Sequence, residues 1–159
     1  VHAINRRGVG SPHVDWMGRP EQTDELLAAS DVLVVAVPLS ERTDGMIGVR
    51  ALGLMKKDAI LVNLARGEVV DEAALYAHLV ANSGFTACID AWWIEPVRHG
   101  RFAMGYGFLD LPNVLASPHN SASVAGARNM AIEQAAVNCR RALEGQPVLH
   151  LIGPEERMR

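Results

Sequence analysis

The fold is decided by an uninterrupted apolar run, Val32-Leu33-Val34-Val35-Ala36-Val37, which Pro38 ends. A strand with one face in water alternates apolar and polar residues, whereas this run contains no polar residue. It therefore predicts a buried strand of a parallel sheet, covered on both faces. Further short apolar runs that predict buried strands lie at 1–4, 59–64, 85–89 and 114–116.

Helices are expected between these strands. Thr23 is a candidate N-cap for the first helix, and residues 49–57 have the pattern of a second. Asp71 is a candidate N-cap for a third, and an Ala-rich helix is expected over residues 121–144. Strands that alternate with helices of this length indicate an α/β fold with a mainly parallel sheet.

The composition excludes several classes of protein. The 159 residues suffice for one domain with a sizeable core, and the formal net charge is -3, so neither nucleic acid nor an anionic membrane is an expected partner. The sequence contains no recognisable secretory signal and no apolar run long enough to cross a bilayer. We expect a cytoplasmic protein without a metal site.

Chemistry is expected at one edge of the sheet, because ligands of open α/β sheets bind beyond the carboxyl ends of the parallel strands. This edge should bring one Arg, one Asp and one His together. The segments that directly follow the predicted strands are Asn5-Arg6-Arg7, Pro38-Leu39-Ser40, Ala65-Arg66-Gly67, Asp90 and Pro118-His119-Asn120.

Three ordered motifs resemble the D-2-hydroxyacid dehydrogenase family. The segment 63–72 is similar to its Asn-x-Ala/Ser-Arg-Gly motif, 90–96 to its Asp-x-x-x-x-Glu-Pro motif, and 113–119 to its Asn-Val-x-x-x-Pro-His motif. The resemblance extends from residue 1 to about residue 150. It implies a Rossmann-type doubly wound parallel sheet that binds a nicotinamide cofactor.

The resemblance also implies that Arg66, Glu95 and His119 are the catalytic residues. The planar guanidinium of Arg66 suits the carboxylate and carbonyl of a 2-oxo acid, although a lone Arg is more often in a surface ion pair. His119 would donate or accept the proton, and Glu95 would orient its ring and favour its charged form. The other histidines are expected to be structural; they are His2, His13, His78, His99 and His150.

The cofactor preference is expected to depend on Asn5, Arg6 and Arg7. Many dinucleotide-binding folds have an acidic residue where Asn5 lies, and its loss together with two arginines favours NADP(H) over NAD(H). The alternative is that both arginines are solvated turn residues. The other expected cofactor contacts are Val37, Pro38, Thr43, Leu64, Ala65, Asp90 (near the nicotinamide) and Ser121.

The Gly-rich G-x-G-x-x-G turn of this fold does not occur in the sequence. We expect it, the first strand and the substrate domain to precede Val1, so that the fold here is an incomplete Rossmann-type sheet. Residues 1–150 would then form most of a dinucleotide-binding domain, and residues 151–159 a tail returning to the substrate domain. Residues 1–159 alone are expected to be inactive.

The expected activity is hydride transfer between a nicotinamide cofactor and carbon 2 of a small 2-hydroxy or 2-oxo acid. A homodimer is expected for the full-length protein. Two alternatives stay open: a corepressor-like protein that senses dinucleotides through this fold, and an inactive fragment of the dehydrogenase. The sequence does not indicate which acid is the substrate.

Overall fold

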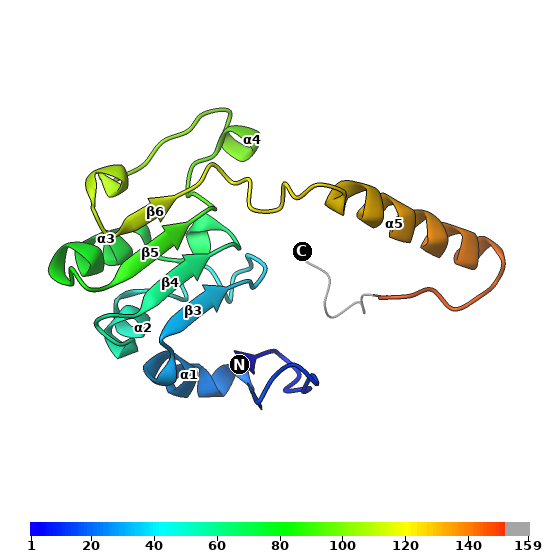
Figure 1. The fold of residues 1–159 in the computed structure, drawn as a ribbon, viewed down its shortest axis with the longest axis horizontal. Coiled ribbons are helices and arrows are strands. Elements are labelled where there is room, and N and C mark those ends of the chain that lie inside the picture. Colours follow the sequence, from blue (N-terminus) through cyan, green and yellow to red (C-terminus); the bar gives the residue numbers. More distant parts are fainter. Residues whose placement is uncertain (152–159) are drawn as a thin grey trace. The chain divides into compact units, whose positions relative to one another are not determined.

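A computed structural model of the chain describes residues 1–151 (Figure 1). It contains two compact units, residues 1–118 and residues 119–159, and each is treated by itself. The first unit carries two parallel sheets, and the second carries the helix α5 (Ala127–Leu143). The predicted tail covers residues 151–159. Apart from Leu151, these residues lie outside the part of the chain that the structure describes.

The larger sheet has four parallel strands in chain order. These strands are β3 (Val32–Val35), β4 (Ile60–Asn63), β5 (Thr86–Ile89) and β6 (Val114–Ala116). Their last residues pair in one row across the sheet, from Val35 through Asn63 and Ile89 to Ala116. The segments that follow the strands therefore leave the sheet along a single edge, as the sequence predicts.

The smaller sheet pairs β1 (His2–Ile4) with β2 (Trp16–Gly18) in parallel. No sequence pattern predicted β2, because three residues are too few to show a strand period. The prediction that the first strand is buried is wrong, since none of the β1 residues is fully buried and Val1 is exposed. Within the described residues, β1 pairs only with β2 and is not in the larger sheet.

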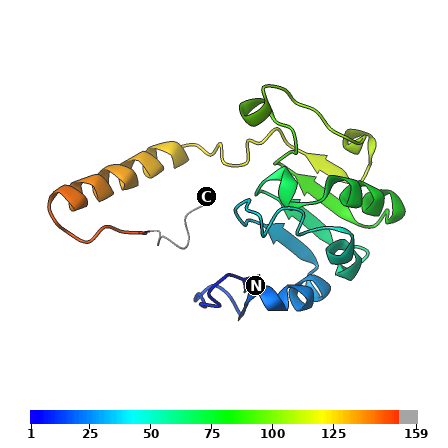
Figure 2. The ribbon, with the colours of Figure 1, turned by 180° about the vertical axis from the view of Figure 1, so that it is seen from behind.

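Three helices bury the apolar face of the larger sheet. They are α1 (Thr23–Ala29), α2 (Val49–Leu54) and α3 (Glu72–Ala81). Their buried leucines include Leu27, Leu52 and Leu75, which pack in one core with Leu61 of β4. Figures 1 and 2 show α2 and α3 on one face of the sheet.

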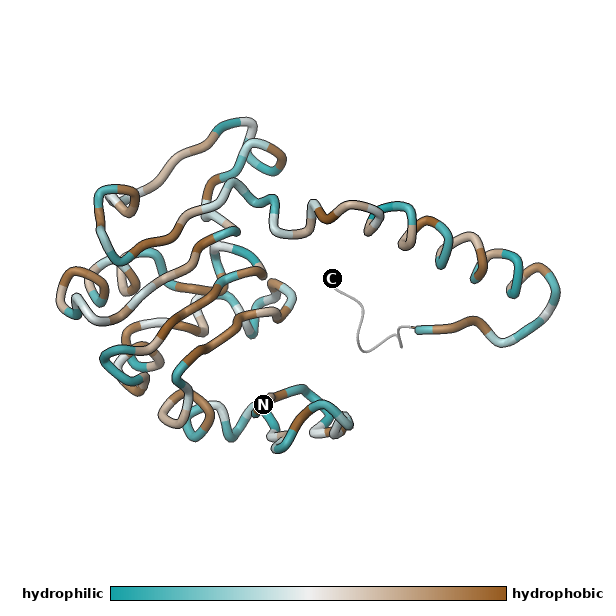
Figure 3. Tube along the Cα trace, in the orientation of Figure 1, coloured by the Kyte–Doolittle hydropathy of each residue, from teal (hydrophilic) through white to brown (hydrophobic). Residues whose placement is uncertain are grey.

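The prediction that the sheet is covered on both faces is wrong for the first unit. Along β3, Leu33 and Val35 are buried, whereas Val32 and Val34 are 53% and 54% exposed. The strands of this sheet are mainly apolar (Figure 3), but in β3, β4 and β5 the buried positions lie on alternate residues only. An apolar run indicates that its residues favour burial, but it does not indicate which other elements cover them.

The helix boundaries show which local signals are reliable. The Asp71 side chain accepts a hydrogen bond from the Ala74 amide at 2.7 Å, so the predicted N-cap is confirmed. Thr23 is not an N-cap: Gln22 is, and the Thr23 hydroxyl donates to the Pro20 carbonyl instead. A Thr one position inside a helix can make this local bond without capping.

Other boundaries differ from the prediction by a few residues. Helix α5 begins at Ala127 instead of residue 121, because Gly126 has a left-handed backbone with φ of 82°. Helix α2 ends at Leu54, three residues early. The segment between β5 and β6 contains a short helix, α4 (Pro96–His99).

Candidate active site

The carboxyl edge of the larger sheet brings together the segments after β4, β5 and β6. Asp90, directly after β5, is 3% exposed, and its carboxylate accepts a hydrogen bond from the Ser117 hydroxyl at 2.5 Å. The Trp92 indole N–H donates to the Ser117 carbonyl at 2.9 Å. These bonds tie the segment after β5 to the segment after β6.

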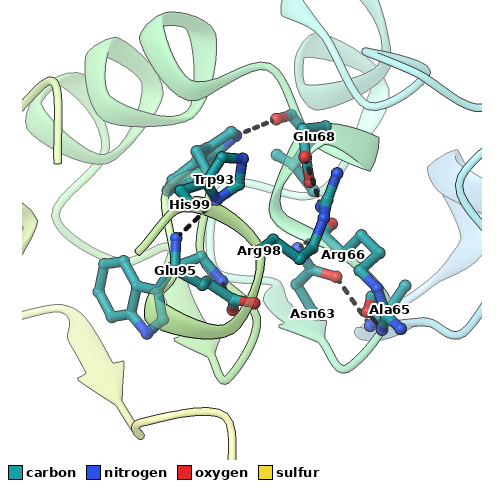
Figure 4. Close-up of polar contacts among 10 residues, drawn as sticks. Asn63, Ala65, Arg66, Glu68, Trp93, Glu95, Arg98 and His99 are labelled. Carbon is teal, nitrogen blue, oxygen red and sulfur yellow. Dashed lines mark hydrogen bonds and ion pairs between the residues drawn. The ribbon is translucent and has the colours of Figure 1, made fainter. Parts of the chain in front are cut away.

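Asn63 shapes the turn that carries Arg66. This side chain is 2% exposed, its Oδ1 accepts from the Ala65 amide at 3.1 Å, and its Nδ2 donates to the Arg66 carbonyl at 3.0 Å (Figure 4). The Asn63 carbonyl also accepts from the Asp90 amide at 3.2 Å. The Asn63 side chain therefore holds the backbone around Arg66, and the Asn63 carbonyl joins this turn to the end of the next strand.

Asn63 is not among the site residues predicted from the sequence. The available signal was an amide as the last residue of an otherwise apolar strand, where an unpaired polar group would be costly. Such an Asn can cap any turn, so the signal alone does not identify its partners.

Arg66 is exposed and follows the strand end in an extended conformation. One of its guanidinium nitrogens donates to the Ala65 carbonyl at 2.6 Å. A guanidinium has five N–H donors, so this bond leaves others for an anionic ligand. The geometry suits the predicted binding of a carboxylate.

Gly67 allows the Arg66 turn to lie directly on the turn after β5. A Cβ at Gly67 would lie 2.3 Å from the Trp92 carbonyl carbon and 2.4 Å from the Trp93 nitrogen. The Trp93 indole N–H donates to the Val70 carbonyl at 2.7 Å. Backbone packing and this bond together fix the two turns against each other.

Glu95 is a buried acid at the start of α4. It is 5% exposed, and its Oε1 accepts from the Trp92 amide at 2.7 Å. Its own amide donates to Nδ1 of His99 at 3.0 Å (Figure 4). A buried carboxylate requires such donors, because desolvating an unsatisfied charge costs several kcal/mol or more.

An ion pair adds a second link between these turns. Arg98, on α4, lies 2.6 Å from Oε1 of Glu68, which follows Gly67. The partners are 30 residues apart in sequence, and both are partly exposed. No sequence pattern predicts this contact.

His119 is the first residue of the second unit. It is exposed, and its φ of 52° places it in the left-handed region that few residues other than Gly adopt. Such backbone strain clusters at functional sites. The pairing of His119 with Glu95 would join the two units, as would a cofactor contact from Ser121, and both stay predictions.

At the end of β1, Asn5 closes a loop. Its Oδ1 accepts from the amides of Arg7 at 3.0 Å and Val9 at 3.2 Å, and its Nδ2 donates to the Val9 carbonyl at 2.8 Å. Arg6 and Arg7 are exposed on this loop. Asn5 thus holds the loop that presents the two arginines.

The other predicted cofactor residues of the first unit lie at strand ends. The Thr43 hydroxyl accepts from the Ser40 amide at 2.8 Å and donates to the Pro38 carbonyl at 2.7 Å, so Thr43 closes the turn after β3. Leu64 is 44% exposed at the end of β4, whereas Ala65 is buried. Val37 is half-buried before the Pro38 turn.

Residues 1–151 provide neither a metal site nor a membrane-spanning helix. The described chain has no group of three or more His, Cys, Asp or Glu side chains that could hold a metal ion. It also has no helix with the length and apolar character that crossing a membrane requires.

Sequence comparison links the chain to a family of dehydrogenases. Residues 1–121 match the family described as D-isomer specific 2-hydroxyacid dehydrogenase, NAD binding domain. A glyoxylate/hydroxypyruvate reductase B of Pectobacterium atrosepticum is 38% identical over 132 residues, which are 83% of this chain and 40% of that protein. A glycerate dehydrogenase of Cucumis sativus is 34% identical over 139 residues, 87% of this chain and 35% of that protein.

Solved structures agree with the sequence comparison. A D-isomer specific 2-hydroxyacid dehydrogenase from Xanthobacter autotrophicus Py2, in complex with NADPH and MES, superposes with a TM-score of 0.80 at 33% identity. The match covers 97% of this chain and 61% of that chain. The fold is therefore α/β and Rossmann-like, and the chain spans 40% of the length of the reductase from Pectobacterium. The chain belongs to the D-isomer specific 2-hydroxyacid dehydrogenase family and comprises sequence of its NAD-binding domain.

Proposed function

We propose that the complete protein transfers a hydride between a nicotinamide cofactor and carbon 2 of a small 2-hydroxy or 2-oxo acid. The observation that carries this proposal is that the turn after β4 and the turn after β5 are fixed against each other at the carboxyl edge of the sheet. There Arg66 follows a turn fixed by Asn63, and the buried Glu95 lies on the adjoining segment. The relatives named as reductases and dehydrogenases support the same reaction class.

Each catalytic residue has a separate task in this proposal. Arg66 binds the acid carboxylate and polarises the neighbouring carbonyl through its remaining N–H donors. His119 donates the proton to the alkoxide oxygen during reduction and accepts it during oxidation. Glu95 orients the imidazole and favours its charged form. The cofactor supplies the hydride.

The residues of this chain fit part of a dinucleotide. The exposed Leu64 and the Asp90 segment lie at the edge where a nicotinamide and its ribose would bind, with Val37, Pro38, Thr43 and Ala65 beside them. The pyrophosphate requires backbone N–H groups of a Gly-rich turn, and the sequence contains no G-x-G-x-x-G motif. We propose that residues 1–150 are most of the dinucleotide-binding domain and that other sequence supplies this turn.

We favour NADP(H) as the cofactor. Asn5 places no carboxylate at the end of β1, and its amide shapes the loop that exposes Arg6 and Arg7. A 2′-phosphate would meet positive charge there without repulsion. We also infer a cytoplasmic homodimer from the family resemblance.

The test is turnover by the complete protein with a panel of 2-oxo acids and either NADPH or NADH. We expect reduction of at least one small 2-oxo acid, with kcat/KM higher for NADPH. Tight cofactor binding without turnover of any acid would favour the corepressor-like alternative. A higher kcat/KM with NADH would refute the cofactor preference but not the reaction class.

A further inference from the structure

The smaller sheet brings a third arginine to the edge where Asn5, Arg6 and Arg7 lie. The strands β1 and β2 are parallel, and the last pair of their register is Ile4 with Gly18. Arg19 therefore follows the end of β2 as Asn5 follows the end of β1. The Asn5 amide donates to the Gly18 carbonyl at 3.3 Å, which joins the two strand ends directly.

The Arg19 side chain packs against the loop that carries Arg6 and Arg7. A Cβ at Gly8 would lie 2.9 Å from Cγ and 3.0 Å from Nε of Arg19. Only a residue without a side chain leaves this space, and Gly8 also has a φ of +64° that other residues rarely adopt. Nε belongs to the guanidinium, so the charged group of Arg19 itself lies next to this loop.

The backbone of Arg19 is fixed, and its charged group is exposed. Its amide donates to Oε1 of Gln22 at 3.1 Å, and its carbonyl accepts from the Gln22 amide at 2.8 Å. Within residues 1–151, the Arg19 guanidinium has no ion pair with a carboxylate. It is therefore available to an anion from solution.

We propose that Arg19 determines cofactor specificity by binding the phosphate of a 2′-phosphorylated adenosine, together with Arg6 and Arg7. The proposal rests on the NADP(H) preference proposed above. A phosphate dianion has three acceptor oxygens, and planar guanidinium groups from two neighbouring strand ends can contact it from different sides. A ribose without the phosphate offers Arg19 no charge to bind.

The experiment measures binding and does not depend on turnover. Isothermal titration with 2′,5′-ADP and with ADP is carried out on the complete protein, on Arg19→Ala and on Arg19→Lys. Lys57→Ala is the matched control, because it removes one positive charge near the amino end of β4, at the opposite edge of its sheet. Thermal melting of each variant confirms that it is folded.

We expect wild type to bind 2′,5′-ADP more tightly than ADP. Arg19→Ala should weaken 2′,5′-ADP by about tenfold while changing ADP by less than about twofold, since it removes one charged hydrogen-bonding group. Arg19→Lys should give an intermediate value, and Lys57→Ala should match wild type.

Two different results would contradict the proposal, and they distinguish a failure of the role of Arg19 from a failure of the NADP(H) preference. If wild type prefers 2′,5′-ADP but Arg19→Ala does not weaken it, or weakens both ligands equally, Arg19 is not the specificity residue. If wild type shows no preference for 2′,5′-ADP, the NADP(H) preference is refuted and the role of Arg19 with it.

Discussion

Glu95 is the buried acid on which the proposed proton transfer depends. Gln is nearly isosteric and keeps an oxygen for the Trp92 amide, so Glu95→Gln preserves the hydrogen bond that holds this turn. In the proposed mechanism, the substitution removes the negative charge that would favour a protonated imidazole at His119. Reduction requires the protonated form, so the lost activity should be restored as the pH is lowered.

We expect Glu95→Gln to reduce kcat for 2-oxo acid reduction by about tenfold or more at pH 8 and by less at pH 6, the size expected for impaired general acid catalysis. The control is Glu68→Gln, which removes an acid that pairs with Arg98 without altering Glu95. A pH–rate profile for Glu95→Gln that parallels wild type would refute this role.

His78 gives a second prediction for a single residue, concerning stability. Its ring packs edge-on against Phe85, with centroids 4.6 Å apart, and its Nε2 is buried without a hydrogen-bond partner among the described residues. Burial lowers the pKa of His78 below its ordinary value. Below about pH 6.5 the unfolded chain therefore binds more protons at this residue than the folded chain does.

The contribution of His78 to the free energy of unfolding should be fully present above about pH 6.5 and decline as the pH falls through the lower folded pKa. His78→Gln, which cannot be protonated, should lose less thermal stability between pH 7.5 and pH 5 than wild type. Melting curves at both values measure this difference. Equal losses in both proteins would show that the half-buried imidazole does not contribute to acid sensitivity.

At the level of elements, the contact between the turn that carries Arg66 and the turn after β5 depends on the absence of a side chain at Gly67. Ala at this position would press its Cβ into the backbone of Trp92 and Trp93, which cannot move aside as a side chain can. We expect Gly67→Ala to lower the free energy of unfolding by about 2–3 kcal/mol, typical of overpacking. Catalysis should fall with it, because Arg66 lies on this turn.

Gly53→Ala is the matched control within a helix. Gly53 lies in α2, is exposed, and has no heavy atom within 4 Å of a built Cβ. Ala has the higher helix propensity, so this variant should be more stable than wild type by about 0.5–1 kcal/mol. Urea unfolding of both variants measures the contrast. Equal stability of Gly67→Ala and wild type would contradict the tight packing.

For the whole molecule, the sequence predicts the strands of the larger sheet and the residues at their ends better than it predicts what covers them. The runs at 59–64 and 85–89 contain β4 and β5, because buried strands require continuous apolar residues. The same continuity suggests cover on both faces, but Val32 and Val34 are exposed within the first unit. An apolar run does not indicate how many other segments of the chain pack against the strand.

The candidate site was predictable where a residue follows a strand and not where it depends on long-range contacts. Arg66 and Asp90 lie at the predicted edge because parallel topology fixes their place. The hydrogen bonds of Asn63, the Glu68–Arg98 ion pair and the contact of Arg19 with Gly8 were not predictable. Each depends on the spacing of two turns in the folded chain, which no local pattern encodes.

The most direct test of the proposed reaction is the kcat/KM for a 2-oxo acid in the complete protein and in Arg66→Gln. The variant should keep wild-type affinity for NADPH, measured by fluorescence, while kcat/KM falls by at least about 100-fold, the size expected for loss of a group that stabilises transition-state charge. Arg50→Gln, at an exposed arginine paired with Asp24, should match wild type. Undiminished kcat/KM in Arg66→Gln, with NADPH binding intact, would contradict the assignment of the site.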